Sequence, residues 1–540
     1  MILTLIDTLQ IQQYIFGSNR LREIVGASEI VKLATGQWLF ESLGIRAEHP
    51  TEVIKNQPAI ETGADFEVIY AGGGNAKILF RDLETAKTVI KRWTKRLLTD
   101  APGLEAEVIH HEFDWSENLN FKNIINTAEA KLARKKARHQ ANLGDLASPF
   151  VARCHSTGLP AAGHISYGKD QERLSSQSLI KREYAEDSFL NEMNKITLKG
   201  ENGKLCTFPK DMDELGQKSG KDYIAIIHAD GNQMGKKIVS LLGDSPSPRH
   251  YIEKVRQFSG DISRTSDLVF EKVLQWVEAN YEQWTNGDTG ILQKNTVKEG
   301  TAKGRTTLPI RPIIIGGDDF TAVVPGVIAL ECCKVYQEAF HEVSKQFSES
   351  FTANGLTASA GVAIVHSHYP FDQAYMMAES LITSAKSAHK DKEEAWIDWH
   401  VSTDTDVDLI WEMRKRKYSY TGGGKKLWLT QKPYRVIGNN TGNRSFDQLI
   451  KDVVKLKNTE DYPRTRLKAL LNSAKEGYEM GEQELQINLI NMKKSKKFES
   501  ILTNYHDTPT LFRSSEPYST AIFDLIETLE FVNENGTGSK

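Results

Sequence analysis

The sequence predicts an α+β protein with two ferredoxin-like domains followed by an α-helical C-terminal domain. Two similar hairpin patterns lead to this prediction, FEVIYAGGGNAKILF at 66–80 and PIIIGGDDFTAVV at 312–324. Each has short β-rich runs on both sides of a glycine-led four-residue turn, as expected for a β-hairpin with function at its tip. The elements expected around each hairpin also follow one order: strand, helices, hairpin, helix, strand, helix. This order folds into an antiparallel sheet backed by helices, an arrangement known as a palm.

Each element of the repeat has a counterpart in the other copy. The first strand, the long helical pattern, the later strand and the closing helix are expected at 1–6, 19–43, 106–109 and 128–140, and again at 223–227, 251–284, 357–365 and 378–390. The closing helices read AEAKLARKKARHQ and AESLITSAKSAHK. Agreement over whole modules favours two diverged copies of one palm over a chance likeness of two glycine-rich hairpins.

The predicted division of the chain has four parts, at 1–140, 141–221, 222–404 and 405–540. The first and third are the two palms. The second is rich in turn formers and charge and reads as a connector with little core of its own. The fourth has helical patterns such as FDQLIKDVVKLK. A Gly-, Thr- and Lys-rich stretch at 286–308 is expected to be a mobile insertion in the second palm.

Composition sets broader bounds. Hydrophobic residues make up 39% and charged residues 26% of the 540 residues, which excludes wholesale disorder. The formal charge of -3 excludes a protein built mainly to neutralise phosphate backbones, although a local basic face remains compatible with it. Four cysteines are too few for a disulfide scaffold. Without a bilayer-spanning apolar segment or a positively charged leader, we expect a cytoplasmic protein with no membrane partner.

The second hairpin has the residues expected of a catalytic site. Gly316 and Gly317 precede Asp318 and Asp319, and two adjacent carboxylates at a tight turn repel each other unless a cation compensates them. Carboxylate oxygens suit Mg²⁺ or Mn²⁺, and the glycines would let a triphosphate approach the backbone. An Asp-Asp pair in a hairpin is by itself most often a solvated turn. Asp230, expected just past the end of the neighbouring strand, makes a two-metal nucleotide site the favoured interpretation.

Other residues extend this predicted site. Backbone amides around Gly231 and Asn232 are candidates for phosphate contact, and Lys386 on the closing helix is a candidate partner of the triphosphate. The first hairpin has the turn Gly72, Gly73, Gly74 and Asn75, without either carboxylate. It should not hold two metals, but its glycines still permit a nucleotide to approach. We therefore predict one catalytic palm and one that binds a nucleotide or only supports the fold.

Several segments resemble a known family. HADGNQMG, GGDDF, SAGVAI and SAKSAHK resemble the second palm of the large polymerase–cyclase subunit of type III CRISPR effector complexes. IQQYIFGSNRLREIVGASEIV and YAGGGN resemble its first palm, and LTQKPY with the following helical patterns resembles its C-terminal domain. The palm resemblance covers about 1–405.

The resemblance implies synthesis of a cyclic oligonucleotide messenger, usually cyclic oligoadenylate, from ATP with Mg²⁺ or Mn²⁺ in antiviral defence. It makes Asp230, Asp318 and Asp319 the metal ligands and catalytic residues. Gly316 and Gly317 would form the phosphate-facing turn, with Lys386 on the triphosphate. The first palm would hold a second nucleotide, and RNA or CRISPR-type proteins would be partners.

The sequence also departs from the family. Larger members carry an N-terminal HD nuclease domain, whereas this sequence begins with the first palm, and the isolated pair at 506–507 does not indicate a nuclease. The family often has a zinc module with paired CxxC motifs, for which this connector offers only Cys154, His155 and Cys206, without that spacing. Cys332 and Cys333 lie in a helical pattern and are expected to be packed thiols.

Two other functions stay open. The stretch 411–500 has 20 Lys or Arg against 10 Asp or Glu and could make the chain an architectural RNA-binding subunit, although a solvated helical face is the favoured interpretation. The GGDD turn also resembles that of diguanylate cyclases. Their chemistry typically uses two active palms from two chains, whereas one palm here carries the acidic turn.

Overall fold

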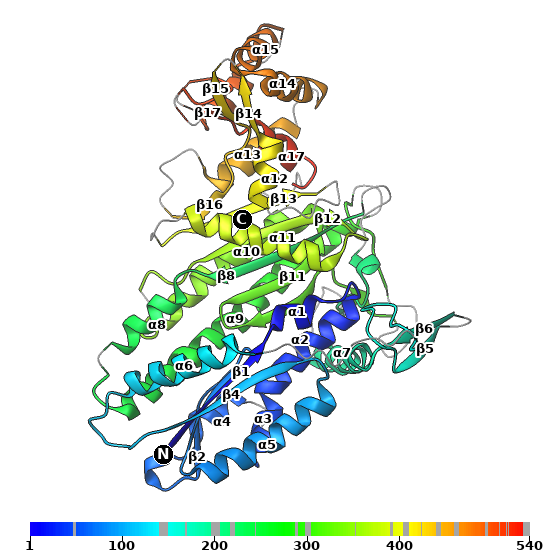
Figure 1. Ribbon diagram of the computed structural model, residues 1–540. Coiled ribbons are helices and arrows are strands. Elements are labelled where there is room, and N and C mark those ends of the chain that lie inside the picture. The colour runs from blue at the N-terminus through cyan, green and yellow to red at the C-terminus, as the bar shows by residue number, and fades with distance from the viewer. Residues whose placement is uncertain are drawn as a thin grey trace.

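The computed structural model places two palms and a C-terminal domain one after another along an elongated molecule (Figure 1). The first palm lies at one end, the second in the middle and the C-terminal domain at the other end. The structure describes residues 1–532 apart from 47–49, 140–149, 168–169, 196–205, 216–221, 244, 287–289, 297–303, 352, 389–392, 403–409, 423, 439–443, 458–463, 492–494, 507, 515 and 517.

The first palm is a four-stranded antiparallel sheet in the order β2-β3-β1-β4. Its strands are β1 (Ile2–Leu9), β2 (Phe66–Gly72), β3 (Asn75–Phe80) and β4 (Glu105–Glu112). Its helices are α1 (Ile11–Phe16), α2 (Leu21–Thr35), α3 (Gln37–Ser42), α4 (Pro50–Asn56), α5 (Leu83–Asp100) and α6 (Phe121–Ala137). The side chain of Asp82 caps α5 by accepting a hydrogen bond from the Thr85 N–H at 2.8 Å.

The second palm repeats this order in its first four strands, β10-β11-β8-β12, and adds β13 and β16 at one edge. Its strands are β8 (Tyr223–Gly231), β10 (Arg311–Gly316), β11 (Asp319–Pro325), β12 (Ala358–His366), β13 (Ala395–Val401) and β16 (Tyr434–Ile437). Its helices are α8 (Met234–Leu242), α9 (Pro248–Thr285), α10 (Gly326–Ser344) and α11 (Phe371–Ala388). Strand β16 comes from beyond the predicted boundary at 404.

The ferredoxin-like order therefore occurs twice, and the predicted α+β class is confirmed. In each palm the β-hairpin lies between two groups of helices in the chain order. Each palm ends with a helix that packs near its first strand, α6 against β1 and α11 against β8. Cys332 and Cys333, expected to be packed thiols, are fully buried on α10.

The palms interlock through matching helices. On β8, Ala225 and Ile227 face α9 and α10, whereas Ile224 and Ile226 belong to a core that contains α11 and also α2 of the first palm. In return, the first part of α9 packs against the first palm's sheet, where it lies over Leu3 and Leu5 with α6. The helical layer that follows the first strand of each palm thus covers a face of the other palm's sheet. Because both faces of β8 are buried, its sequence YIAIIHADG is apolar nearly throughout.

The connector is better packed than its composition predicts. It contains β5 (Gly163–Tyr167), β6 (Asp170–Leu174), α7 (Ser176–Lys195) and β7 (Cys206–Thr207). Helix α7 lies along α2 so closely that a Cβ at Gly26 would come within 1.6 Å of the Lys181 carbonyl oxygen. The described part of 286–308, expected to be mobile, includes buried Leu292 and Leu308, and its strand β9 (Thr306–Thr307) pairs with β7. Apolar anchors that periodicity does not detect hold the described part of this stretch in place.

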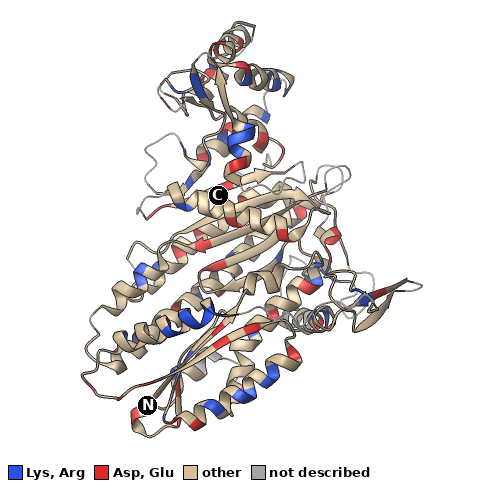
Figure 2. Ribbon diagram, viewed as in Figure 1, with Lys and Arg blue, Asp and Glu red and all other residues tan. Residues whose placement is uncertain are grey.

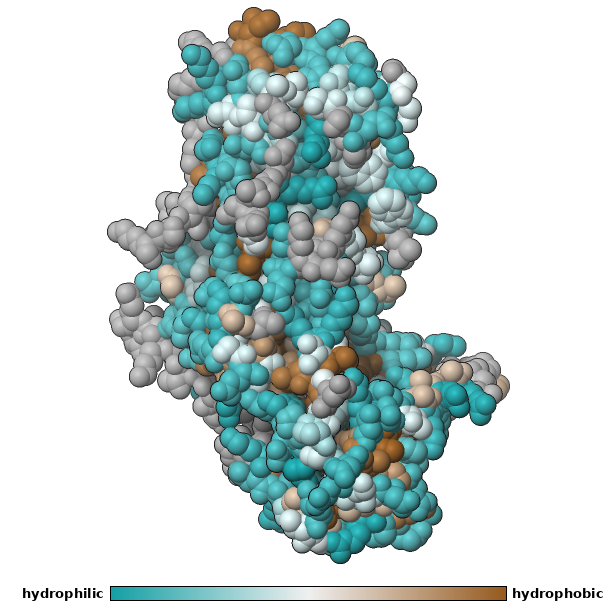
Figure 3. All heavy atoms as spheres, turned by 90° about the vertical axis from the view of Figure 1, so that its left-hand side faces the viewer, coloured by the Kyte–Doolittle hydropathy of each residue, from teal (hydrophilic) through white to brown (hydrophobic). Residues whose placement is uncertain are grey.

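The C-terminal domain is mainly helical, as predicted, with α12 (Ile410–Tyr418), α13 (Phe446–Lys457), α14 (Arg464–Glu476), α15 (Tyr478–Asn491), α16 (Ser495–Leu502) and α17 (Ile522–Thr528). It also holds a small sheet of β14 (Ser419–Gly422), β15 (Lys425–Trp428) and β17 (Tyr518–Ser519). Met480, Ile487 and Ile490 of α15 are exposed, and apolar surface is visible at this tip of the molecule (Figure 3). Among the described helices, none combines the length and apolarity needed to cross a bilayer.

Candidate active site at the second hairpin

Strand register brings three aspartates together. Asp319 begins β11 and pairs across the strands with Asp230 of β8, while the hairpin itself closes with Gly316 opposite Asp319. Asp318 lies in the turn between them. The antiparallel arrangement thus places the end of β8 beside the hairpin tip, as the sequence predicted.

Glycines make this arrangement possible. A Cβ at Gly231 would come within 2.7 Å of the Asp318 Cβ, so the Asp318 side chain occupies space that only a glycine leaves at that position of β8. Gly317 has a φ of +62°, which favours glycine. A Cβ at Gly316 or Gly317 would meet no atom within 4 Å, so the turn faces open space in which a ligand could approach the backbone.

The three carboxylates repel one another. Burial, followed by the charge of Asp230, raises the pKa of Asp318 to about 6, and burial with the charges of Asp230 and Asp318 raises that of Asp319 to about 8. The Asp319 side chain is nonetheless accessible to solvent, so repulsion from Asp230 and Asp318 is the main cause of its raised pKa. Lys386, in the last turn of α11, forms an ion pair with Asp230 Oδ2. One ammonium faces three acidic groups.

The chemistry of these side chains suits a divalent cation, since hard carboxylate oxygens that repel each other are relieved by one. Among the described residues, however, no three His, Cys, Asp or Glu side chains are arranged as a ready coordination set. The Lys386 ammonium lies on Asp230 in this arrangement. Asp230, Asp318 and Asp319 are thus a fitting donor set whose side chains would have to adjust to enclose a metal.

Asn232 has a different place from the predicted one. Its N–H donates to the Thr357 carbonyl at 2.8 Å, and its side-chain NH₂ donates to Thr357 Oγ1 and the Glu394 carbonyl. Its Oδ1 accepts a hydrogen bond from Ser359 Oγ at 2.9 Å. Asn232 is buried and its groups are engaged within the protein, so it holds the end of β8 against β12 and does not offer them to phosphate.

A buried polar network that the sequence analysis missed lies behind the site. His228, on the same side of β8 as Asp230, contacts Thr321 Oγ1 at 2.9 Å and the Tyr375 hydroxyl at 3.4 Å. Tyr375 of α11 stacks on Phe16 of the first palm, with ring centroids 3.7 Å apart. Spacing of two from Asp230 on a strand is the signal that could have placed His228 on this side.

The first palm reaches the same region through Tyr70. Its hydroxyl donates to the Gly72 carbonyl at 3.0 Å, within the first hairpin. Burial and the nearby charge of Asp318 raise the pKa of Tyr70. Tyr70 is thus near both hairpins, one from each palm.

The first palm keeps half of the polar arrangement. Asp7 of β1 pairs across the strands with Asn75, in the position that Asp230 has opposite Asp319, and its Oδ2 lies 2.6 Å from Lys136 Nζ of α6. Lys136 aligns with Lys386 when the two closing helices are superposed in sequence. This second Asp–Lys pair was visible in the repeat but had not been predicted.

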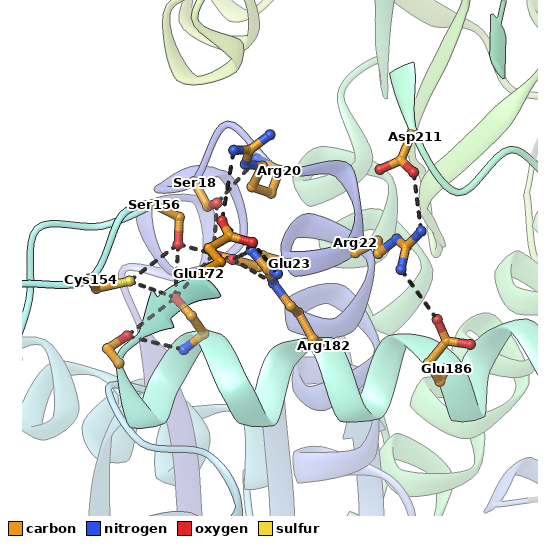
Figure 4. Close-up of polar contacts among 12 residues, drawn as sticks. Ser18, Arg20, Arg22, Glu23, Cys154, Ser156, Glu172, Arg182, Glu186 and Asp211 are labelled. Atoms are coloured by element: carbon orange, nitrogen blue, oxygen red, sulfur yellow. Dashed lines mark hydrogen bonds and ion pairs between the residues drawn. The ribbon is translucent and has the colours of Figure 1, made fainter. Parts of the chain in front are cut away.

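Cys154, one of the connector residues considered for zinc, lies in a network of hydroxyls and charged side chains (Figure 4). Cys154 Sγ lies 3.3 Å from Ser156 Oγ and 3.6 Å from Ser178 Oγ. Burial would raise the pKa of this thiol, but hydrogen bonds from neighbouring hydroxyls lower it to about 6. The same hydroxyls surround fully buried Glu23, which forms an ion pair with Arg182 at 2.8 Å. The network joins the connector to α2, and the described residues here include no group of three His, Cys, Asp or Glu side chains that could hold a metal ion.

Residues 223–394 match the family model for the second palm domain of Cas10/Cmr2. This segment lies within the predicted second palm and contains the three aspartates, Lys386 and the GGDD turn. The resemblance to the large subunit of type III CRISPR complexes, which we inferred from sequence motifs, is therefore confirmed. Among the curated proteins, none has a significant match to the sequence.

Matches among solved structures include Csm1 and Csm1–Csm4 assemblies. A Csm1–Csm4 cassette in complex with cA3 has 13% identity and a TM-score of 0.46, covering 98% of this chain and 70% of that one. A cassette in complex with cA4 has 13% identity and a TM-score of 0.40, covering 84% and 62%. Csm1 of T. onnurineus has 14% identity and a TM-score of 0.40, covering 86% and 62%. The chain thus spans less than two thirds of two of these three relatives.

Proposed function

We propose that the protein is a Cas10-like nucleotidyltransferase that makes a cyclic oligonucleotide, with ATP as substrate, in CRISPR-type antiviral defence. The observation that carries the proposal is the convergence of Asp230, Asp318 and Asp319 beside Lys386, within the segment that matches the Cas10/Cmr2 second palm. The family resemblance favours ATP over other nucleotides. The proposed reaction joins a ribose 2′- or 3′-hydroxyl of one nucleotide to the α-phosphorus of the next and releases pyrophosphate.

In this proposal the three aspartates hold Mg²⁺ or Mn²⁺. Bound divalent cations would activate the attacking hydroxyl and stabilise the leaving pyrophosphate. Gly316 and Gly317 leave room for the triphosphate beside the backbone, and Lys386 exchanges Asp230 for a phosphate oxygen. Asn232 acts at one remove by keeping the end of β8, and with it Asp230, in place.

The first palm would hold the second nucleotide. Its turn has positive φ at Gly72, Gly73 and Gly74, and its Asp7–Lys136 pair stands where the second palm has Asp230 and Lys386. Tyr70 beside this turn lies within range of the charge of Asp318, and two nucleotides held on the two hairpins would react by proximity. Type III proteins and RNA are the partners that the family resemblance suggests.

The test incubates purified full-length chain with each NTP and Mn²⁺, with and without single-stranded RNA, and identifies products by mass spectrometry. We expect cyclic oligoadenylate and pyrophosphate, both lost in Asp318→Ala/Asp319→Ala. The control Glu271→Ala/Glu282→Ala removes the same charge from exposed positions on α9 and should keep activity. A Mn²⁺-dependent rise in Tm should likewise vanish in the first variant and persist in the second.

Contrary outcomes are distinct. Unchanged product in Asp318→Ala/Asp319→Ala would remove these residues from the mechanism. Cyclic dinucleotide from GTP alone would favour the diguanylate cyclase alternative. No product under any condition, with no Mn²⁺-dependent change in Tm, would favour the architectural role.

A further inference from the structure

Two tryptophans contact each other on the surface of the C-terminal domain. Trp411 is 65% exposed, and its ring centroid lies 6.0 Å from that of half-buried Trp428, with 37° between the ring planes. Single exposed apolar residues are common on proteins. Two indoles in contact, one of them mostly in solvent, leave a large aromatic surface in water that a flat partner could cover.

The two rings come from different elements of the fold. Trp411 lies in the first turn of α12, and Trp428 ends β15. Helix α12 runs directly into β14, whose Ser419 pairs with Trp428 across the hairpin, and the Leu429 N–H donates to the Tyr418 carbonyl at 2.8 Å. The spatial relation of the two rings therefore rests on main-chain pairing.

Exposed cations flank the pair. Lys415 is one helical turn after Trp411, and Lys426 is two residues before Trp428, on the same face of the strand. Lys425 shows the contrast, because it points to the other face, where its Nζ lies 3.5 Å from the Tyr478 ring centroid. Figure 2 shows basic residues on both α12 and β15.

We infer that Trp411 and Trp428 form a stacking site for a base of single-stranded nucleic acid, with Lys415 and Lys426 near the adjoining phosphates. Every base has a π-face, so aromatic platforms beside basic residues bind single strands with little sequence preference. A protein partner would also use tryptophan, but lysine is depleted in the cores of protein interfaces. The two flanking lysines therefore favour a nucleic acid.

Charge should contribute less to this site than stacking does. Asp404, Asp406 and Asp408 precede α12 in the sequence and lie outside the described residues. With two lysines as the expected phosphate contacts, the dependence of affinity on salt should be shallow. The site uses none of the three aspartates of the second palm, so its failure and that of the proposed enzymatic function are distinguishable.

The test measures fluorescence anisotropy of labelled ten-nucleotide RNA and DNA strands of one unstructured sequence, bound by the full-length chain. Trp411→Ala and Trp428→Ala should each weaken binding about 5- to 150-fold, and Trp411→Phe less. Phe150→Ala, which removes an aromatic ring that is 95% exposed elsewhere, should leave it unchanged. Lys415→Gln/Lys426→Gln should lower the salt slope by about 1.4, whereas Lys451→Gln, at an exposed position of α13, should not.

Circular dichroism and Tm identify the variants that fold, and Trp411, being the more exposed, allows the safer change. Equal weakening for RNA and DNA supports stacking on any single strand, and a preference for RNA supports the same site with an added 2′-hydroxyl contact. No binding by the native chain, or unchanged affinity in folded Trp411→Ala and in Lys415→Gln/Lys426→Gln, overturns the inference and leaves a protein surface as the role of this pair.

Discussion

The two palms share one topology and differ at a pair of facing positions. In the first palm Thr8 of β1 faces Gly74 of the turn, and the Thr8 N–H and hydroxyl both donate to the Gly74 carbonyl at 2.8 Å. In the second palm Gly231 takes the place of Thr8, and Asp318 takes the place of Gly74. Each arrangement has one small residue and one larger one, so a carboxylate in the turn requires a glycine on the strand.

This exchange explains why the first palm cannot accept an aspartate at Gly74 by one substitution. A Cβ at Gly74 would lie 2.3 Å from Thr8 Oγ1 and 2.4 Å from Ile11 Cδ1, and Gly74 has a φ of +82°. An aspartate there would be strained and would collide with its neighbours. The difference between the palms is therefore built into two positions on separate elements.

The most direct test of the difference between the palms is to place a residue of the first palm at the matching position of the second. Gly231→Thr places the first palm's residue in the second, where its Cβ would collide with Asp318. We expect catalysis by the proposed enzyme to fall about 100-fold, because a small misplacement of a reacting group costs this much. The measurement is the initial rate of pyrophosphate release. A variant that folds and keeps its native rate would show that Asp318 need not occupy this position.

The turns should also differ in their tolerance of a methyl group. Gly74→Ala should lower the free energy of unfolding by about 2–4 kcal/mol, since it combines a left-handed backbone with overpacking. Gly316→Ala, where a Cβ meets no atom within 4 Å, should change it by less than about 0.5 kcal/mol. Urea titration of both variants compares them directly. Equal loss of stability would mean that the two turns are equally confined.

Asp318 and Asp319 of the second palm should contribute to the pH dependence of stability. In the folded chain the pKa values of Asp318 and Asp319 are about 6 and 8, above the ordinary 3.8, so folding retains protons that the unfolded chain releases. Their contribution is present below about pH 4 and is lost as the pH rises towards 8. Asp318→Asn/Asp319→Asn should therefore have a higher Tm than the native chain at pH 8.5 in EDTA, and the same Tm near pH 4.

Thermal scans across this pH range in EDTA check the prediction. Asp7→Asn is the control from the first palm, where the change breaks an ion pair with Lys136 and should not raise the Tm. If the native chain and Asp318→Asn/Asp319→Asn kept a constant difference in Tm at all pH values, repulsion among the carboxylates would not be its source.

The smallest expected effect concerns the Asp–Lys pair of the first palm. Lys136 is 41% exposed, so Lys136→Ala should reduce the free energy of unfolding by only about 0.2–1 kcal/mol. A double-mutant cycle with Asp7→Asn measures the coupling. If the first palm binds a nucleotide as proposed, the same variant raises KM more than it lowers kcat. A larger effect on kcat than that of Lys386→Ala would reverse the roles assigned to the two palms.

Most of what could be predicted about the fold and the site came from local sequence patterns. The glycine-led turns and the order of elements identified both palms, and three aspartates could be grouped because a strand end and a hairpin tip meet in an antiparallel sheet. Contacts between residues far apart in the chain leave no such pattern in the sequence. The role of Asn232 depends on Thr357, Ser359 and Glu394, which are far away in sequence, so no local rule could show that its hydrogen bonds were engaged.

The connector shows the same limit. Its turn formers and charges suggested little core, yet Arg182 is buried with Glu23 of α2, 159 residues away in sequence. The desolvation of such a buried ion pair is offset by the attraction between the two charges and by hydrogen bonds, none of which composition reveals. Strand β16 likewise joins the second palm from beyond the predicted boundary, through pairing with β13.

The sequence by itself determined the repeat, the fold class, the acidic turn and the family resemblance, because each depends on residue order over short stretches. Only the tertiary structure decided that the first palm has no room for a carboxylate at Gly74 whereas the second has room at Asp318, since that depends on the side chains packed against each turn. It also decided that Tyr70 of one palm lies near Asp318 of the other, and that Trp411 meets Trp428 at the surface. These relations arise from packing between elements, which no periodicity in the chain records.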